Sequence, residues 1–337
     1  MLHITKVSFP GLGIGEFSVE SDAFSINGNF AIAWYALIIC LGMIFAVSYV
    51  IFRSNRIGID SEQILDFALF VIPIGVIGAR LYYVIMEYEQ FKGSFAEILN
   101  IRGGGLAIYG GIIAGAITVF VICMIKKINF LAFADCVVPG LIMAQAIGRW
   151  GNFMNGEAFG TITDSFLRMG IQNYNTFRTF GVTEMVYVHP TFLYESLWNI
   201  LGFAAVNIFY KHKKYDGQIF FMIFGWYGLG RMMIEGLRTD SLYLWGTNIR
   251  ASQALALLLF VACAAFQVYF AIKRPSKPFY YHNSNGAAVI SDANETVEKT
   301  EDTAKLETEV IDAQNAEEDA EDSNSTINNE ETLTDGE

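Results

Sequence analysis

Long apolar runs separated by short polar segments dominate the pattern of this chain. Each run is close to the roughly 20 residues that an α-helix needs to cross a bilayer. A helix satisfies its own backbone hydrogen bonds in lipid, so runs of this length are expected to be helical. The pattern predicts an all-α, polytopic membrane protein with seven transmembrane helices, at approximately 30–52, 64–86, 103–125, 128–148, 190–210, 218–238 and 251–272.

Basic residues between the runs indicate the orientation. Seven spans place four basic groups on one side of the membrane: Arg53 and Arg56; Lys126 and Lys127; Lys211, Lys213 and Lys214; and Lys273, Arg274 and Lys277. Cytoplasmic loops carry an excess of lysine and arginine. This side is therefore predicted to be cytoplasmic, with the N-terminus outside and the C-terminus inside.

The acidity of the chain belongs to its C-terminal end. The formal net charge is −12, but residues 291–337 hold 17 of the 34 acidic residues and only 2 of the 22 basic ones. A segment that is acidic and poor in aromatic residues is typical of disorder. We expect three parts: an extracytoplasmic segment 1–29, a seven-helix membrane domain 30–272 with an outer loop 149–189, and a cytoplasmic, acidic, disordered tail 273–337.

The composition excludes several classes of function. Hydrophobic residues make up 53% and charged residues 17%, against about a quarter charged in soluble proteins. All four cysteines lie in apolar runs without C-x-x-C spacing, and four scattered histidines argue against a zinc or haem site. We expect no metal and no cofactor, and the short cytoplasmic basic groups give nucleic-acid binding no support.

Polar residues gather at the predicted outer ends of several runs. A charge at the bilayer centre costs roughly 2.5–3.5 kcal/mol on insertion scales, so such residues usually face a bundle interior or a polar cavity. One arginine alone would suit snorkelling or a structural ion pair, but a group of this size favours a site. Its members are Arg80, Tyr109, Arg149, Asn152, Asn155, Glu157, His189, Glu195, Arg231, Glu235 and Arg238.

The run 218–238 carries a polar stripe. Tyr227, Arg231, Glu235 and Arg238 are spaced i, i+4, i+8 and i+11, which is one face of a helix. An Arg–Glu pair that stabilises the helix would explain part of it. Two arginines against one glutamate leave a positive charge, however, and Arg149 adds another. Guanidinium groups grip phosphate bidentately, so a lipid phosphate is the expected ligand.

The stretch RGGGLAIYGGIIAG (102–115) holds six glycines. Close helix packing of the small-xxx-small type is one interpretation. Close approach of the backbone to a ligand, or a helix N-terminus that binds an anion, is the other. The sequence leaves both open.

These blocks resemble the bacterial prolipoprotein diacylglyceryl transferases. GRWGNFMNGEAFG (148–160) is similar to the signature of that family, and RGGGLAIYGG (102–111), HPTFLYES (189–196) and RMMIEGLR (231–238) match further blocks in the same order. The resemblance covers roughly residues 25–272. It implies transfer of the diacylglyceryl group of phosphatidylglycerol to the lipobox cysteine of a prolipoprotein, which forms a thioether and releases glycerol 1-phosphate. It also implies a multi-pass protein of the bacterial plasma (inner, cytoplasmic) membrane, with membrane lipid and prolipoprotein signal peptides as partners.

The resemblance also implies residue roles. Arg149 and Arg238 would hold the phosphate as catalytic residues, and Arg231 would contribute through its pair with Glu235. The remaining residues would shape or line the headgroup site: Asn152, Asn155, Glu157, Tyr35 and Tyr227.

The general base is open. Many family members carry a histidine where this chain has Tyr109, and tyrosine has an unperturbed pKa near 10. Tyr109 would act as the base if arginines lowered its pKa. His189 is the alternative, although HPTF also reads as a helix start with proline near its first turn.

Two other classes compete with an enzyme. A transporter or channel with an outward-facing anion site would also use buried arginines, but the charges gather in one leaflet and form no path across the midplane. A structural membrane protein would leave the arginine group unexplained.

Overall fold

A computed structural model describes residues 4–26, 30–92, 94–101, 104–239, 250–273, 281–282 and 288–289. The chain divides into two units, Met1–Ala287 and Ala288–Glu337. Within the second unit only β8 (Ala288–Val289) is described, and β7 (Tyr281–His282) is the last described element of the first. The predicted acidic tail therefore lies almost wholly outside the described residues.

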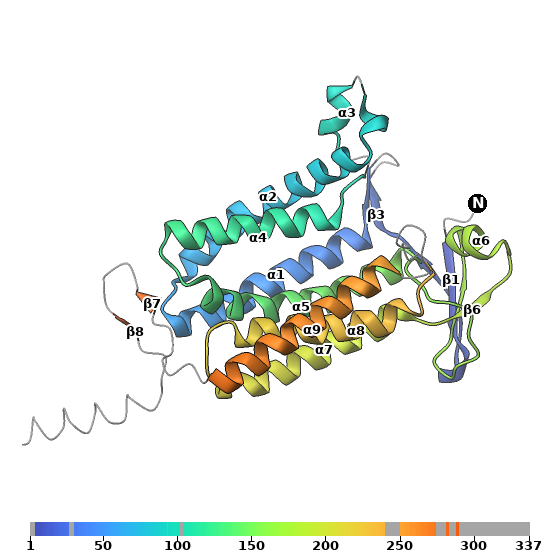
Figure 1. The fold of residues 1–337 in the computed structure, drawn as a ribbon. Helices are drawn as coiled ribbons and strands as arrows, with labels where there is room; N and C mark the ends of the chain where they lie inside the picture. The colour runs from blue at the N-terminus through green and yellow to red at the C-terminus, as the bar shows by residue number, and fades with distance from the viewer. Residues whose placement is uncertain are drawn as a thin grey trace, which may run out of the picture. The chain divides into compact units, whose positions relative to one another are not determined.

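The described chain is mostly helical (Figure 1). Six helices are long and apolar enough to cross a membrane: α1 (Trp34–Ser54), α2 (Ser61–Met86), α4 (Ile108–Ile125), α5 (Phe130–Met154), α7 (Thr191–Phe209) and α9 (Ala251–Lys273). The helix α8 (Gln218–Glu235) has 18 residues but is too polar to count among them. The prediction of a polytopic helical protein thus holds for six spans by length and composition.

Two helix boundaries differ from the prediction in ways that matter for the site. The helix α5 continues to Met154, so the first half of the block GRWGNFMNGEAFG is helical. The helix α8 ends at Glu235, before the predicted boundary at residue 238, and Gly236 caps it. As a result Arg238 lies on the segment that follows α8.

Helices that are distant in sequence run side by side (Figure 1). The helices α2 and α4 form one pair, α1 lies along α5, and α7 and α8 contact α5 from another side, with α9 on α8. The pair α2–α4 approaches very closely, because a Cβ on Gly110 would lie 2.3 Å from the carbonyl oxygen of Gly78. The structure therefore supports helix packing as the purpose of the second half of the glycine-rich stretch.

The all-α prediction is wrong for the segments beside the bundle. A four-stranded antiparallel sheet has the order β2-β1-β5-β6, built from β1 (Ile4–Phe9), β2 (Ile14–Glu20), β5 (Met169–Gln172) and β6 (Val186–Val188). A second sheet pairs β3 (Asp22–Ile26) with β4 (Phe30–Ala33), so the first four residues predicted for the helix 30–52 form a strand. Strands of three to seven residues give only short alternating patterns, which the long apolar runs overshadow.

Short helices complete the described chain. They are α3 (Phe95–Leu99), α6 (Tyr174–Phe180) and four 3-10 turns: η1 (Pro10–Leu12), η2 (Asn55–Ile57), η3 (Tyr88–Phe91) and η4 (Tyr210–His212). Asn173 and Thr176 form a capping box at the start of α6, in which each side chain accepts the backbone N–H of the other residue.

The sheet is joined to the end of the bundle by its own apolar core. Val7, Ile171 and Val188 from the strands pack with Phe159 from the loop after α5 and Phe192 from α7. We call this end of the bundle the strand end. The burial of five large side chains at the junction fixes the loop after α5 against the start of α7.

A buried group of charged side chains lies at the end of the bundle opposite the strand end. Asp135 on α5 is fully buried, and its two carboxylate oxygens accept the backbone N–H groups of Gly217 and Phe220, each at 2.7 Å. Lys213 lies 3.0 Å from Asp135 and 2.8 Å from Asp216. We call these three charged side chains the Asp135 cluster; through it α5 caps the start of α8.

Candidate active site

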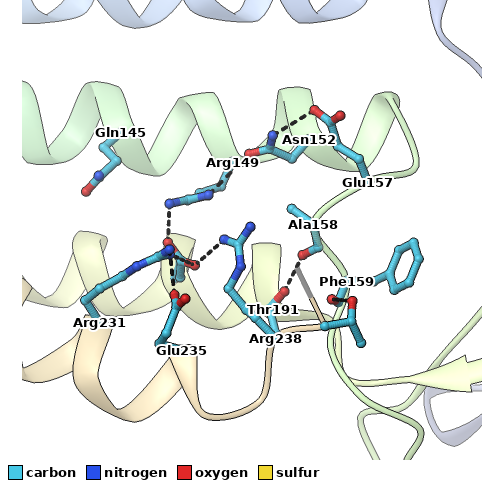
Figure 2. Close-up of polar contacts among 12 residues, drawn as sticks. Gln145, Arg149, Asn152, Glu157, Ala158, Phe159, Thr191, Arg231, Glu235 and Arg238 are labelled. Atoms are coloured by element: carbon cyan, nitrogen blue, oxygen red, sulfur yellow. Dashed lines mark hydrogen bonds and ion pairs between the residues drawn. The ribbon is translucent and has the colours of Figure 1, made fainter. Parts of the chain in front are cut away.

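Three arginines converge on one glutamate at the strand end (Figure 2). Glu195 of α7 pairs with Arg149 of α5, with Arg231 of α8 at 3.0 Å and with Arg238 at 3.2 Å. Arg231 also lies 2.6 Å from Glu235, one helical turn further along α8. We call these five residues the arginine cluster.

The helix geometry explains the convergence. Arg231 and Glu235 are four residues apart, so they share the face of α8 that looks into the bundle. Glu195 stands in the second turn of α7 and Arg149 in the last two turns of α5, which brings both to the same depth. Arg238 reaches the cluster from beyond the end of α8, where the backbone of Gly160 forms a β-bridge with it.

The arginine cluster is buried and rich in cations. The side chains are 16% exposed for Arg149, 10% for Arg238 and 2% for Glu235. Within the cluster three guanidinium groups face two carboxylates. The Nε of Arg149 is buried and has no hydrogen-bond partner in the described part of the chain. Such a site can accept a further anion with oxygen acceptors.

The second half of the sequence block extends the cluster. Arg149 donates to Asn152 at 3.4 Å, and the amides of Asn152 and Asn155 donate to one oxygen of Glu157 at 3.0 and 3.2 Å. A continuous line of polar contacts therefore leads from the guanidinium groups to Glu157 (Figure 2).

The loop after α5 holds an unfavourable backbone conformation. Gly156 and Ala158 have φ of +59° and +57°, a region that suits glycine and strains alanine by about 1–2 kcal/mol. Side chains fasten both carbonyls: Asn173 and Asn175 donate to Gly156 at 2.8 and 3.2 Å, and Thr191 donates to Ala158. The start of α6 and the start of α7 thus hold Glu157 in place from two sides.

Comparison with known proteins agrees with these features. The model of the family described as prolipoprotein diacylglyceryl transferase matches residues 21–269. The chain is 42% identical over 280 residues to the phosphatidylglycerol–prolipoprotein diacylglyceryl transferase of Listeria monocytogenes serovar 1/2a, covering 82% of this chain and 99% of the relative. It is 45% identical over 240 residues to the phosphatidylglycerol–prolipoprotein diacylglyceryl transferase 1 of Clostridium perfringens. That match covers 70% of this chain and 88% of the relative.

The chain belongs to the prolipoprotein diacylglyceryl transferase family. The match spans every long helix of the bundle except the last four residues of α9, and it includes the whole arginine cluster. The resemblance seen in the four sequence blocks is thereby confirmed.

Several residues expected in a site of this family do lie together. The structure brings Arg149, Arg231 and Arg238 into direct contact with Glu195, and Glu235 contacts Arg231. Asn152 and Glu157 adjoin Arg149. Tyr35 lies against α5, since a Cβ added to Gly151 of that helix would lie 2.7 Å from the ring of Tyr35. Tyr227 precedes Arg231 by one turn on α8.

The two candidate bases stand apart from this network. Tyr109 opens α4, is 48% exposed and makes no hydrogen bond through its hydroxyl to another described residue. His189 lies just before α7, where its Nδ1 is 3.3 Å from the hydroxyl of Tyr194. Burial lowers the pKa of His189, which favours the neutral form that can accept a proton.

Glu195 is the common partner of the three arginines, which the sequence did not reveal. Its position at the start of an apolar run placed it among the polar residues at the outer ends of the runs. That position gives its depth in the membrane, but it does not show which way the side chain faces around the helix axis. Its position five residues after the proline that leads the helix, in the block HPTFLYES, was the available signal. One turn further into the bundle, Asn199 donates to Gln145 at 2.9 Å and closes the inner side of the arginine cluster.

Arg80 has a different role from that of the other arginines. Its guanidinium group donates to the backbone carbonyls of Glu97, Ile98, Gly104 and Gly105 at 2.6–2.9 Å. All its hydrogen bonds in the described chain thus fasten the connection between α2 and α4.

Proposed function

We propose that this protein transfers the diacylglyceryl group of phosphatidylglycerol to the lipobox cysteine of prolipoproteins. Membership of the family supports the enzyme class, because the relatives named above carry this activity in their names. The observation that carries the proposal within the structure is the convergence of Arg149, Arg231 and Arg238 on Glu195 inside a bundle of apolar helices, with the buried Nε of Arg149 without a hydrogen-bond partner among the described residues. The family match gives no support to a transporter or a scaffold.

The reaction requires a sulfur nucleophile and a phosphate leaving group. The thiolate of the acceptor cysteine bonds to the glyceryl carbon that bears the phosphate ester, the carbon–oxygen bond breaks, and its electron pair leaves on the phosphate oxygen as glycerol 1-phosphate. Negative charge accumulates on that phosphate, so preorganised cationic donors stabilise the transition state more than the ground state. The thiol proton goes to a base, because the thiolate is the reactive form.

The side chains of the site divide this work. Arg149 and Arg238 hold the phosphate, and Glu195 orients both guanidinium groups toward it. Arg231 is held between Glu195 and Glu235 and adds its positive charge to the site. Asn152, Asn155 and Glu157 hydrogen-bond the polar headgroup, while the lining of the site is completed by Tyr35 and Tyr227. No metal or cofactor takes part in this scheme.

Tyr109 is our first candidate for the proton acceptor and His189 the second. Tyr109 opens α4 at the same end of the bundle as the arginine cluster, and it stands where relatives carry a histidine. Burial lowers the pKa of His189 and keeps it in the neutral form, but its ring nitrogen already faces Tyr194.

The proposal includes seven spans, with α8 as the seventh. Arg231 and Glu235 make α8 polar, but both face the bundle and pair there, so they do not meet lipid. The strand end is then outside the cell, together with segment 1–29 and loop 149–189. The opposite end and the tail 273–337 are cytoplasmic, in the plasma membrane of a bacterium. Arg274 and Lys277 lie outside the described residues.

Labelling tests this topology. In a cysteine-free background, a membrane-impermeant maleimide should label Ser165→Cys in intact cells and Lys214→Cys only after lysis, because both positions are exposed at opposite ends of the bundle. Equal labelling of both in intact cells would contradict seven spans.

The activity is tested with purified protein, phosphatidylglycerol and a lipobox peptide. The peptide should gain the mass of one diacylglyceryl group on its cysteine, with release of one glycerol 1-phosphate. The Listeria monocytogenes relative serves as the positive control. An unmodified peptide under conditions in which that relative modifies it would overturn the proposed function.

A further inference from the structure

A polar pocket of about 280 Å³ lies beside the arginine cluster at the strand end. Its lining comes from the loop after α5, from α6 and from the segment after α8: residues 157–159, Asn175, Arg178, Thr179 and Thr239. Two connections tie it to the cluster. Thr239 directly follows Arg238, and Glu157 is linked through Asn152 to Arg149.

The pocket offers unused hydrogen-bond donors. The backbone N–H groups of Ala158 and Phe159 have no partner in the described chain, whereas both carbonyls are occupied, by Thr191 and Thr239 respectively. Two successive N–H groups next to a cavity suit the carbonyl oxygens of an extended polypeptide, as in recognition through main-chain hydrogen bonds.

The pocket also presents one charge of each sign. Glu157 accepts from two amides but has no cationic partner among the described residues, and Arg178 is exposed with no ion pair in that same part of the chain. A phosphate bound here would face the carboxylate of Glu157 and would lack the guanidinium pairs of the arginine cluster. The pocket therefore suits a polar, largely uncharged ligand better than a lipid phosphate.

We propose that this pocket binds the substrate polypeptide immediately after its acceptor cysteine, so that main-chain carbonyls meet the N–H groups of Ala158 and Phe159 while Arg178 senses the side chains that follow. The inference rests on the proposed function. A cysteine whose sulfur lies at the arginine cluster has an apolar signal segment on one side, which remains in lipid. The chain on its other side leaves the bundle at the strand end, where this pocket lies.

Charge reversal at Arg178 tests the proposal. The experiment compares three lipobox peptides that have the same sequence up to and including the cysteine. After the cysteine, one peptide carries two serines, one carries two aspartates and one carries two lysines. Arg178→Glu should lower kcat/KM for the aspartate peptide relative to the lysine peptide by about fivefold, as expected for a partly exposed charge pair. The KM for phosphatidylglycerol should not change. Lys6→Glu is the matched control, because it is an exposed reversal of the same sign that does not line the pocket.

The possible results separate the proposals. An unaltered ratio between the peptides, or the same ratio change in Lys6→Glu, overturns the pocket assignment. A raised KM for phosphatidylglycerol with all three peptides assigns the pocket to the lipid headgroup and also overturns it. If the unaltered protein modifies none of the peptides, the proposed function fails, and this outcome is distinct from the others.

A second measurement does not depend on the folding of the reversed variant. A photo-crosslinking phenylalanine derivative in place of Thr179 should capture the peptide at a residue after the cysteine. Capture only before the cysteine, only of lipid, or of neither substrate contradicts the assignment.

Discussion

The two ends of α5 carry buried charges that serve different purposes. Asp135 and Arg149 are 14 residues apart on this helix, which is about 20 Å along its axis. In the Asp135 cluster both carboxylate oxygens receive a backbone N–H, and the one lysine is shared between two carboxylates. In the arginine cluster three cations face two carboxylates, and the Nε of Arg149 has no hydrogen-bond partner among the described residues.

The difference shows what distinguishes a binding site from a structural contact. Burial and charge are common to both clusters, so neither identifies a site. The Asp135 cluster has its hydrogen-bonding capacity used up and fastens α5 to the start of α8. The arginine cluster keeps a buried donor, the Nε of Arg149, without a hydrogen-bond partner among the described residues. Mutations should therefore separate stability at one end from activity at the other.

Removal of Asp135 should have the largest effect, and on stability. Asp135→Ala leaves two backbone N–H groups and Lys213 without their carboxylate, so we expect a loss of about 3–5 kcal/mol in the free energy of unfolding. Thermal unfolding in detergent measures it, and activity per folded molecule should be nearly unchanged. Asp135→Asn, which keeps one acceptor, should lose less. A stable Asp135→Ala protein without activity would place Asp135 in the active site, and the two ends of α5 would then not differ in purpose.

Replacement of Arg149 should give the opposite result. Arg149→Ala removes a phosphate donor, so kcat/KM should fall by about 10²–10³-fold, the effect typical of a lost donor to a developing oxyanion. The midpoint of thermal unfolding should move little, because the variant also removes one of three neighbouring cations. Arg149→Lys should recover only part of the activity, since an ammonium group cannot grip bidentately. Full activity of Arg149→Ala would exclude this residue from phosphate binding.

From the sequence it could be predicted that the arginines of the arginine cluster lie close together, whereas the Asp135 cluster could not be predicted. Apolar runs fix the depth of each residue in the membrane, and Arg149, Arg231 and Arg238 share one depth. Depth alone did not show that Glu195 is their common partner, because that depends on the rotation of α7 against α5 and α8. Asp135 stands inside a predicted run, and its partners are backbone N–H groups at the start of another helix, which no side-chain pattern reveals.

The sheet was missed for a related reason. Pairing of β1 with β5 joins residues about 165 positions apart, and strands of four to six residues give weak periodicity. Yet this sheet places Asn173, which directly follows β5, caps α6 and holds the loop that carries Glu157. The helical frame could thus be predicted from hydrophobicity, whereas the part that shapes the strand end of the site depends on non-local pairing.

Tyr109 tests whether the site extends beyond the arginine cluster to α4. If its hydroxyl accepts the thiol proton, Tyr109→Phe should lower kcat by about 10²-fold with little change in stability, because general-base catalysis contributes typically 10²–10⁴-fold. The comparison variant is His189→Gln. Near-normal turnover of Tyr109→Phe together with a strong loss in His189→Gln would transfer the role to the histidine.

The smallest expected effect concerns burial, because the end of the bundle opposite the strand end has two lysine–aspartate pairs that differ in exposure. Lys213 is 18% exposed against a fully buried Asp135, whereas Lys126 and Asp66 are 31% and 54% exposed at 2.9 Å. Burial opposes the charged form of Lys213, but Asp135 and Asp216 outweigh it and raise its pKa, so its contribution to stability is complete at neutral pH and is lost only as the pH rises through that pKa.

Lys126→Ala should therefore change the free energy of unfolding by no more than about 0.5 kcal/mol, because solvent screens an exposed pair. Lys213→Ala should lower it by about 2–3 kcal/mol, because a buried carboxylate loses its cation. Both variants are measured by thermal unfolding in the same detergent at neutral pH, and 0.5 M salt should reduce only the smaller effect. Equal losses in the two variants would mean that the Asp135 cluster owes its stability to the backbone cap of α8 alone.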